Sequence, residues 1–392
     1  MPSSPSPAVA DGWTPLSFLA ALGAGGLAVA FFMWPMFWID HPGRPAPVFE
    51  DVMAAFAAGG PALDAALWVA LGGVGVFAAL HVALLIGAFS AWARWRGTEA
   101  ARRLRTSNAE TQMLAAPLTV AMSINVGFIL GLLFVPGLWS MVELLFPMAL
   151  AAFLLVGVWA LRLTAAFWAR VLGEGGFDVD ANASFAQLLP AFALAMVAVG
   201  LAAPAAMSGT DWVVALSFVA SRFFLIAAGV VAAVKLFLGM REMMRHGVAV
   251  ESAPTLWIAI PILTVAAIAL MRASHGAHGH LGGEETPFET FLLLTNVLAA
   301  QLVFGLMGWV VLKRVRYFER FVDGPEVSVG SWALVCPGVA LTVLLHFFAN
   351  KGLVGVGLAA RFDPLWWTVT GAALAVHAAT ILLALKLLAK HH

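Results

Sequence analysis

The chain alternates long apolar stretches with short polar segments. A helix that crosses a bilayer needs about 20 mainly apolar residues, because the hydrocarbon core is roughly 30 Å thick and each residue rises about 1.5 Å. Ten stretches reach this length, so the pattern predicts ten transmembrane helices. The predicted helices cover residues 15–39, 64–93, 112–139, 141–168, 185–207, 212–239, 254–271, 287–312, 329–349 and 364–388.

Proline or clustered glycine lies in the interior of every odd-numbered stretch, whereas the even-numbered stretches carry proline only near their first turns. An interior proline frees carbonyl groups that lipid cannot satisfy, so such helices belong where neighbouring helices or water can meet those groups. We therefore predict five helical hairpins, with kinked odd-numbered helices around a central pore and even-numbered helices outside. The alternative is that membrane helices simply tolerate these residues. The residues concerned are Gly25, Gly26 and Pro35 in the first stretch, Pro117 in the third, Pro190 and Pro204 in the fifth, Pro261 in the seventh and Pro337 in the ninth.

Composition also indicates an integral membrane protein. Of the 392 residues, 62% are hydrophobic and 11% are charged, whereas a soluble domain carries about 25% charged residues. The 21 basic and 21 acidic residues balance, so the overall charge gives no sign of a nucleic-acid partner. Residues 1–14 are polar and lack the basic start of a signal peptide. We expect them to form a disordered cytoplasmic tail, followed by a single transmembrane domain over residues 15–392.

Basic residues are distributed unequally between the two ends of the predicted helices. Sixteen of the 21 lie on one side, among them the cluster from Arg94 to Arg105, and five lie on the other. Short cytoplasmic loops retain the lysine and arginine excess. We therefore expect both termini to be cytoplasmic and the protein to lie in a bacterial-type inner membrane.

Four short segments carry a family resemblance. The first stretch contains LGAGGLA and the third APLTVAMSINV, the seventh lies within RHGVAVESAPTLWIAIPILTVAAIAL, and the ninth contains SWALVCPGVAL. In this order they resemble the tellurite-resistance/dicarboxylate transporters and slow anion channels, in whose ninth helix Trp-Ala, two residues and Phe-Pro recur. The resemblance runs over most of the chain from Trp13 on. It implies a homotrimer in which each protomer holds a pore for small inorganic or carboxylate anions.

The ninth stretch holds the only cysteine, Cys336, directly before Pro337. In the resembled family a phenylalanine plugs the pore at this position, so the resemblance places Cys336 at the gate, where Phe128 or Phe32 could fill a wider constriction. A further resemblance is to the TsoY-type (seleno)protein branch, in which selenocysteine can stand at this position and would make the site relevant to redox chemistry. The alternative is a small buried side chain beside a kink, and a single thiol has no resolving partner.

Arg222 lies about ten residues into the sixth stretch, where an ionisable group is costly and suggests a function. It could add positive potential to an anion path. The alternative is an ion pair between protomers, or one with Asp211 or Glu143 in the same chain.

Intramembrane histidines support a second class of function. His81 and His377 lie midway along helices that run in the same direction, so they could ligate a haem, although both are on outer helices. Interhelical hydrogen bonding is the default expectation for both histidines, and it is also the expected role of Asn125 in the third stretch. The tract HGAHGH, from His275 to His280, is expected to form a solvated outer loop.

The chain lacks the motifs GxxxxGK[ST], GxSxG and HExxH, so ATP-driven transport and these hydrolytic reactions have no recognisable apparatus. We therefore expect a channel or secondary transporter for small anions rather than an enzyme, with no resident cofactor or metal. The alternative is a membrane redox protein that uses a haem or the Cys336 thiol.

Overall fold

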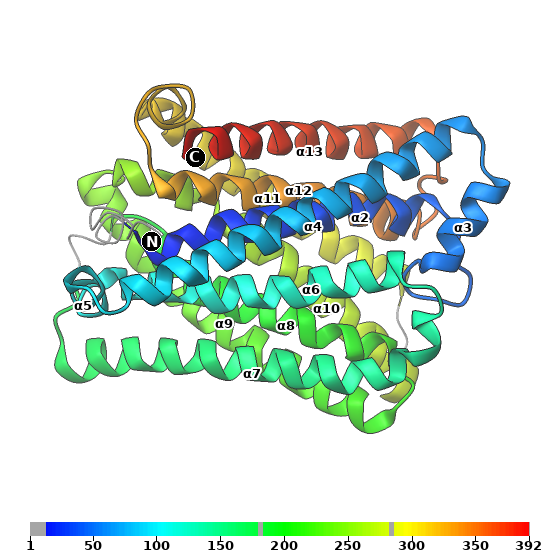
Figure 1. Cartoon of the computed structure of the whole chain (residues 1–392), viewed down its shortest axis with the longest axis horizontal. Helices are drawn as coiled ribbons and strands as arrows, with labels where there is room; N and C mark the ends of the chain where they lie inside the picture. Colours follow the sequence, from blue (N-terminus) through cyan, green and yellow to red (C-terminus); the bar gives the residue numbers. More distant parts are fainter. Residues whose placement is uncertain (1–12, 179–182, 282–285, 392) are drawn as a thin grey trace, which may run out of the picture.

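The structure, a computed structural model, describes residues 13–178, 183–281 and 286–391, with only the backbone described for residues 277–281. All regular structure in these residues is helical. Among them, ten helices are long and apolar enough to cross a membrane, which confirms the predicted all-α membrane fold (Figure 1). The α-helical parts of these spans are α2 (Phe18–Trp38), α4 (Pro61–Trp95), α6 (Ala115–Phe134), α7 (Val142–Trp168), α8 (Leu189–Met207), α9 (Asp211–His246), α10 (Ala259–Leu281), α11 (Pro287–Arg314), α12 (Val335–Phe347) and α13 (Pro364–His391).

The two ends of the helix bundle differ in what they carry. The first described residues and the C-terminal end of α13 lie at one end, together with the short helix α5 (Glu99–Arg105) (Figure 1). We call this the terminal end. The short helix α3 (Phe49–Ala58) lies at the opposite end, which we call the distal end. That the terminal end faces the cytoplasm stays a prediction.

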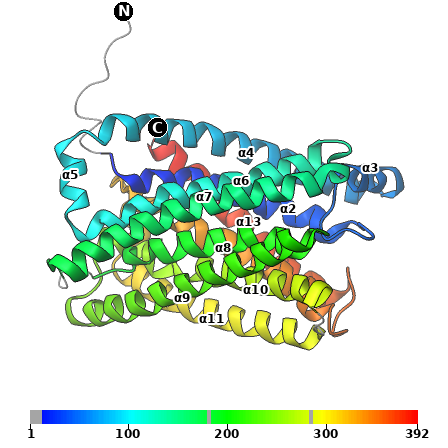
Figure 2. The same cartoon turned by 90° about the horizontal axis from the view of Figure 1, so that it is seen from below.

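The odd-numbered spans lie inside the bundle and the even-numbered spans lie outside. In the most apolar part of each span, 50% to 94% of the residues are buried in the odd-numbered helices, against 17% to 39% in the even-numbered ones. Figure 2 shows α4 and α11 at opposite edges with α8 between them. Large apolar side chains such as Leu155 and Val303 are exposed on the outer helices. These faces suit contact with lipid, because apolar side chains that face hydrocarbon tails do not have to be buried away from water.

Four prolines of the inner helices do not interrupt α-helices in the way that the sequence suggested, whereas Pro35 and Pro204 do lie inside α2 and α8. Pro117, Pro190, Pro261 and Pro337 each lie in the first turn of an α-helix, so the prediction that they break helix interiors is wrong. A proline there is well tolerated, because its missing N–H would have had no partner within the helix. Each inner span instead begins with a short 3₁₀ segment at the terminal end. These segments are Pro15–Ser17, Asn108–Leu114, Ala186–Leu188, Val250–Trp257 and Val329–Leu334.

Two glycines allow aromatic rings to pack α7 closely against inner α8 and outer α9. A Cβ atom at Gly200 would lie 2.2 Å from Cε1 of Phe153, and one at Gly157 would lie 2.3 Å from Cζ of Phe224. Each ring therefore occupies the space that any larger side chain would need. The contacts hold α7 against α8 and α9, which fixes one wall of the central cavity.

Helix α10 continues to Leu281, so the backbone of the tract from His275 to His280 is helical. The expectation of an outer loop is therefore wrong for this tract. The side chain of His275 is exposed, and the side chains of His278 and His280 lie outside the described residues. Because α10 is longer than predicted, residues after 271 lie within the helix, whereas the sequence pattern placed them beyond its end.

Candidate functional site

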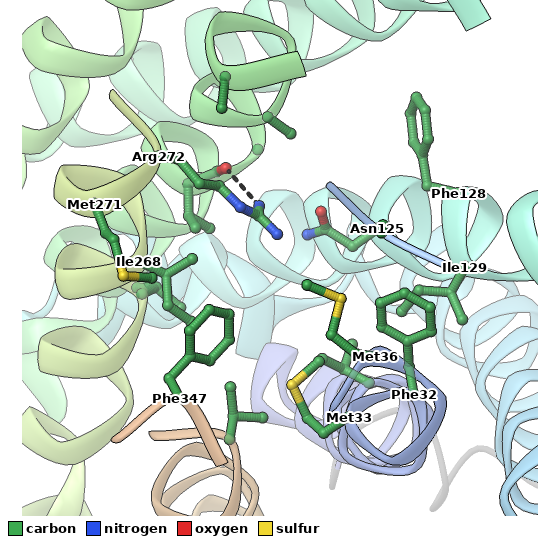
Figure 3. A pocket seen from close by; sticks show the side chains of 18 of the residues that line it. Phe32, Met33, Met36, Asn125, Phe128, Ile129, Ile268, Met271, Arg272 and Phe347 are labelled. Atoms are coloured by element: carbon green, nitrogen blue, oxygen red, sulfur yellow. Dashed lines mark hydrogen bonds between the residues drawn. The ribbon is translucent and has the colours of Figure 1, made fainter. Parts of the chain in front are cut away.

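A cavity of about 970 Å³ lies at the centre of the bundle. Most of its wall comes from the inner helices α2, α6, α8, α10 and α12, which places the cavity between these helices. Figure 3 shows side chains from several of these helices converging on it. Outer helices contribute little, mainly through Phe146 and Phe153 of α7.

The cavity reaches the distal end but not the terminal end. Its wall includes Pro45 and Gly355, both exposed in distal loops. Toward the terminal end, the lining of the five inner helices stops at Leu22, Met122, Phe192, Pro261 and Cys336. Beyond these positions the inner spans carry buried apolar residues, among them Leu118, Leu188, Leu256 and Val335. The cavity is therefore closed by a packed apolar layer on the terminal side.

The cavity wall is mainly apolar and unusually rich in methionine. Six of the 15 methionines of the chain line it, and Met33, Met36 and Met271 are visible in Figure 3. Methionine adapts its shape readily, so the wall can accommodate guests of different outline. A wall of this kind offers few hydrogen bonds to a polar guest. The few polar groups in it therefore provide most of the polar contacts that such a guest could make.

The charged groups of the wall are all basic among the described residues that line it. They are Arg44, Arg272 and Lys351, with no aspartate or glutamate. Arg44 is neutralised locally, because its Nε donates to Asp51 Oδ2 at 3.0 Å and its Nη2 also contacts that carboxylate. The hydrogen bond to Asp51 raises the pKa of Arg44 above its ordinary value. Lys351 is exposed at the distal mouth.

Arg272 is the charged group that lies deepest in the wall, and the sequence analysis did not select it. Its Nη1 donates to the carbonyl oxygen of Val199 over 3.4 Å, a long hydrogen bond. Among the described residues, no carboxylate lies within the 4 Å of an ion pair with its guanidinium group. The signal that could have identified Arg272 is its position four residues before the end of an apolar span, Val250–Gly276.

The structure brings together about half of the residues predicted for the pore. Gly26, Phe32, Phe128, Pro261 and Cys336 all line the cavity. Cys336 is partly exposed and lies at the closed end, next to the apolar layer. Its role as a gate stays a prediction.

The other predicted pore residues lie behind the wall. Pro117, Pro190 and Pro337 are buried and do not line the cavity. Gly25 is buried against helices α4 and α6, since a Cβ there would lie 2.7 Å from Cγ of Met122 and 2.8 Å from Nδ1 of His81. Its part is therefore close helix packing.

The two histidines proposed for a haem are not brought together. His81 has both ring nitrogens engaged, with Nδ1 2.7 Å from the carbonyl oxygen of Ala21 and Nε2 2.8 Å from Oγ of Ser123. His377 instead packs on the ring of Phe31 at 4.4 Å. Ala21 and Phe31 are ten residues apart on α2, about 15 Å along a helix, so the histidines lie at different depths. The geometry therefore contradicts a haem held between them.

Arg222 lies on outer helix α9, outside the cavity wall. Its guanidinium carbon is 5.5 Å from the centre of the Phe218 ring. Glu143, one of the partners considered for it, accepts hydrogen bonds from Ser208, Thr210 and the backbone of Gly209. Arg222 therefore does not contribute to the surface of the cavity.

Comparison with known proteins adds no family assignment. No protein-family model matches the chain, and a search of curated proteins finds no relative. The resemblance of the four segments thus remains a hypothesis.

Proposed function

We propose that the protein carries small anions across the membrane through the central cavity, either as a gated channel or as a secondary transporter. The observation that carries the proposal is the charge of the cavity wall, which among the described residues is supplied by arginine and lysine alone. In a cavity with apolar walls, fixed charge of one sign raises the local concentration of the opposite ion. Cations would meet no compensating carboxylate along this wall.

Because the cavity is closed on its terminal side, transport requires a change of structure there. An anion that enters from the distal end reaches the level of Cys336 and then meets the layer that includes Leu118 and Val335. This layer must open, or the inner helices must move, for the anion to pass. The same closure keeps ions from leaking in the state that the structure represents.

The experiment is anion flux into vesicles that contain the purified protein. Chloride, nitrate, sulfite, selenite and malate form the panel, with protein-free vesicles as the reference. At least one of these anions should enter faster than in the reference. Uniform rates equal to the reference across the panel would contradict the proposal.

Cys336 allows the route to be tested with the same vesicles. It is the only cysteine in the chain and it lines the cavity, so a small thiol reagent added from the distal side should attach there and slow the flux. The Cys336→Ala protein is the matched control and should be insensitive to the reagent. Equal inhibition of both proteins would show that the reagent acts elsewhere.

A further inference from the structure

Two hydrogen-bond donors of the cavity wall point at one another. Figure 3 shows the guanidinium group of Arg272, from α10, directed toward the amide group of Asn125, from α6. Both side chains are anchored to the same part of α8, Arg272 through the carbonyl of Val199 and Asn125 through the sulfur of Met196. Residues 196 and 199 are separated by about 4.5 Å along a helix, so the two groups lie at nearly the same depth.

Asn125 has a donor to spare. Its Nδ2 donates to the carbonyl oxygen of Ala121 at 3.2 Å, which uses one of the two amide hydrogens. The other contact of Nδ2 is Met196 Sδ at 3.7 Å, and a thioether sulfur is a weak acceptor. The second hydrogen is therefore available to a stronger acceptor inside the cavity.

Arg272 has more donors than partners. A guanidinium group carries five N–H bonds in a planar fork, and the long hydrogen bond to Val199 occupies one of them. The surrounding wall is apolar, with Ile268, Met271 and Phe347 labelled near it in Figure 3. The guanidinium group and the amide nitrogen of Asn125 thus both offer unused N–H donors to the same space, which suits an anion.

We propose that Arg272 and Asn125 bind one small monovalent anion with two coplanar oxygen atoms, a monocarboxylate or nitrate, between the guanidinium fork and the amide N–H. The planar fork of arginine matches such a pair of oxygens bidentately. A dianion is disfavoured, because Arg44 is already bound to Asp51 and Lys351 lies exposed at the mouth. The inference deepens the proposed function, on which it rests for an anion in the cavity.

Binding is tested by isothermal titration calorimetry on the purified, detergent-solubilised protein with sodium formate as the probe. The parent should bind formate saturably, and Arg272→Gln should bind it roughly ten- to hundredfold more weakly, as expected for loss of charged hydrogen bonds. The matched control is Arg222→Gln, which removes an intramembrane arginine that lies outside the cavity and should bind like the parent. Equal affinities of the parent and Arg272→Gln would overturn the site.

Two further variants test the chemistry of the site. Arg272→Lys keeps the charge but loses the fork, so the preference for formate over chloride should fall several-fold. Asn125→Asp places a carboxylate opposite Arg272, which should occupy the guanidinium group internally and abolish formate binding without loss of thermal stability. Unchanged formate binding by Asn125→Asp, or tighter binding of malate than of formate by the parent, would overturn the assignment.

The flux and binding experiments fail independently. Saturable formate binding that depends on Arg272, together with no anion flux, would contradict the proposed transport and leave the site intact. Flux that is identical in the parent and in Arg272→Gln, with no saturable binding in either, would leave transport intact. In that case water alone would satisfy the two donors, and the site would be overturned.

Discussion

His81 offers a direct test of whether the intramembrane histidines are structural. Its Nδ1 lies 2.7 Å from the Ala21 carbonyl, which only accepts, so Nδ1 carries the proton. Nε2 then competes with the Thr119 carbonyl, at 3.1 Å, for the single hydrogen of the Ser123 hydroxyl, which lies 2.8 Å from Nε2. The ring thus links α4 to α2 and α6, and it is 1% exposed. An interhelical hydrogen bond in a membrane contributes about 0.6 to 1.5 kcal/mol, so His81→Leu should lower the free energy of unfolding by about 1 to 3 kcal/mol.

The assay is unfolding of purified protein in mixed micelles of rising SDS content, followed by tryptophan fluorescence. The matched control is His377→Leu, because Nε2 of His377 is buried without a hydrogen-bond partner among the described residues. That substitution removes an unsatisfied polar atom and should leave the midpoint unchanged or raise it. Equal losses for both variants would refute the account, as would a Soret band of purified protein that disappears in His81→Leu.

Three further predictions concern the gate, the orientation and a helix start. Cys336→Phe should fold and slow anion flux, because the larger ring enters a cavity rather than a packed core; unchanged flux in a well-folded protein would rule out a gate there. In a Cys336→Ala background, cysteines introduced between Arg94 and Arg105 should not react with an impermeant thiol reagent outside intact cells, and efficient labelling would reverse the predicted orientation. Asp363 accepts from the backbone N–H groups of Trp366 at 2.7 Å and Ala360 at 2.8 Å, and these bonds lower its pKa below the ordinary 3.8. Its contribution to stability is full above pH 3.8 and is lost as the pH falls through the lowered pKa, so Asp363→Ala should lower the melting temperature at pH 7 and converge with the parent in acid.

The number of helices and their division into inner and outer groups could be predicted from the sequence. Length and hydropathy define a membrane span almost by themselves, since the bilayer sets the length that is required. The inner helices were identified from interior prolines and glycines, and all of these residues do lie on inner helices. For Pro117, Pro190, Pro261 and Pro337 the reason differs from the one inferred, because they lie in the first turns of α-helices that follow 3₁₀ segments. Pro35 and Pro204 do lie inside α2 and α8.

The proposed anion site could not be predicted from the sequence, for two physical reasons. The seventh stretch was predicted to end at residue 271, which placed Arg272 among the charges at a helix end, whereas α10 continues to Leu281 and keeps the residue in the cavity wall. The direction of Asn125 depends on the rotation of α6 about its axis. That helix is apolar on nearly all sides, so its sequence pattern does not reveal which face is turned inward.

The central claim is that the cavity selects anions, and one measurement tests it most directly. Entry of anions and of potassium should be compared in the same protein-containing vesicles, with protein-free vesicles as the reference. The account predicts that small anions enter faster than in the reference and that potassium does not, because the described wall of the cavity carries only basic charges. Faster entry of potassium with no acceleration of any anion would contradict it.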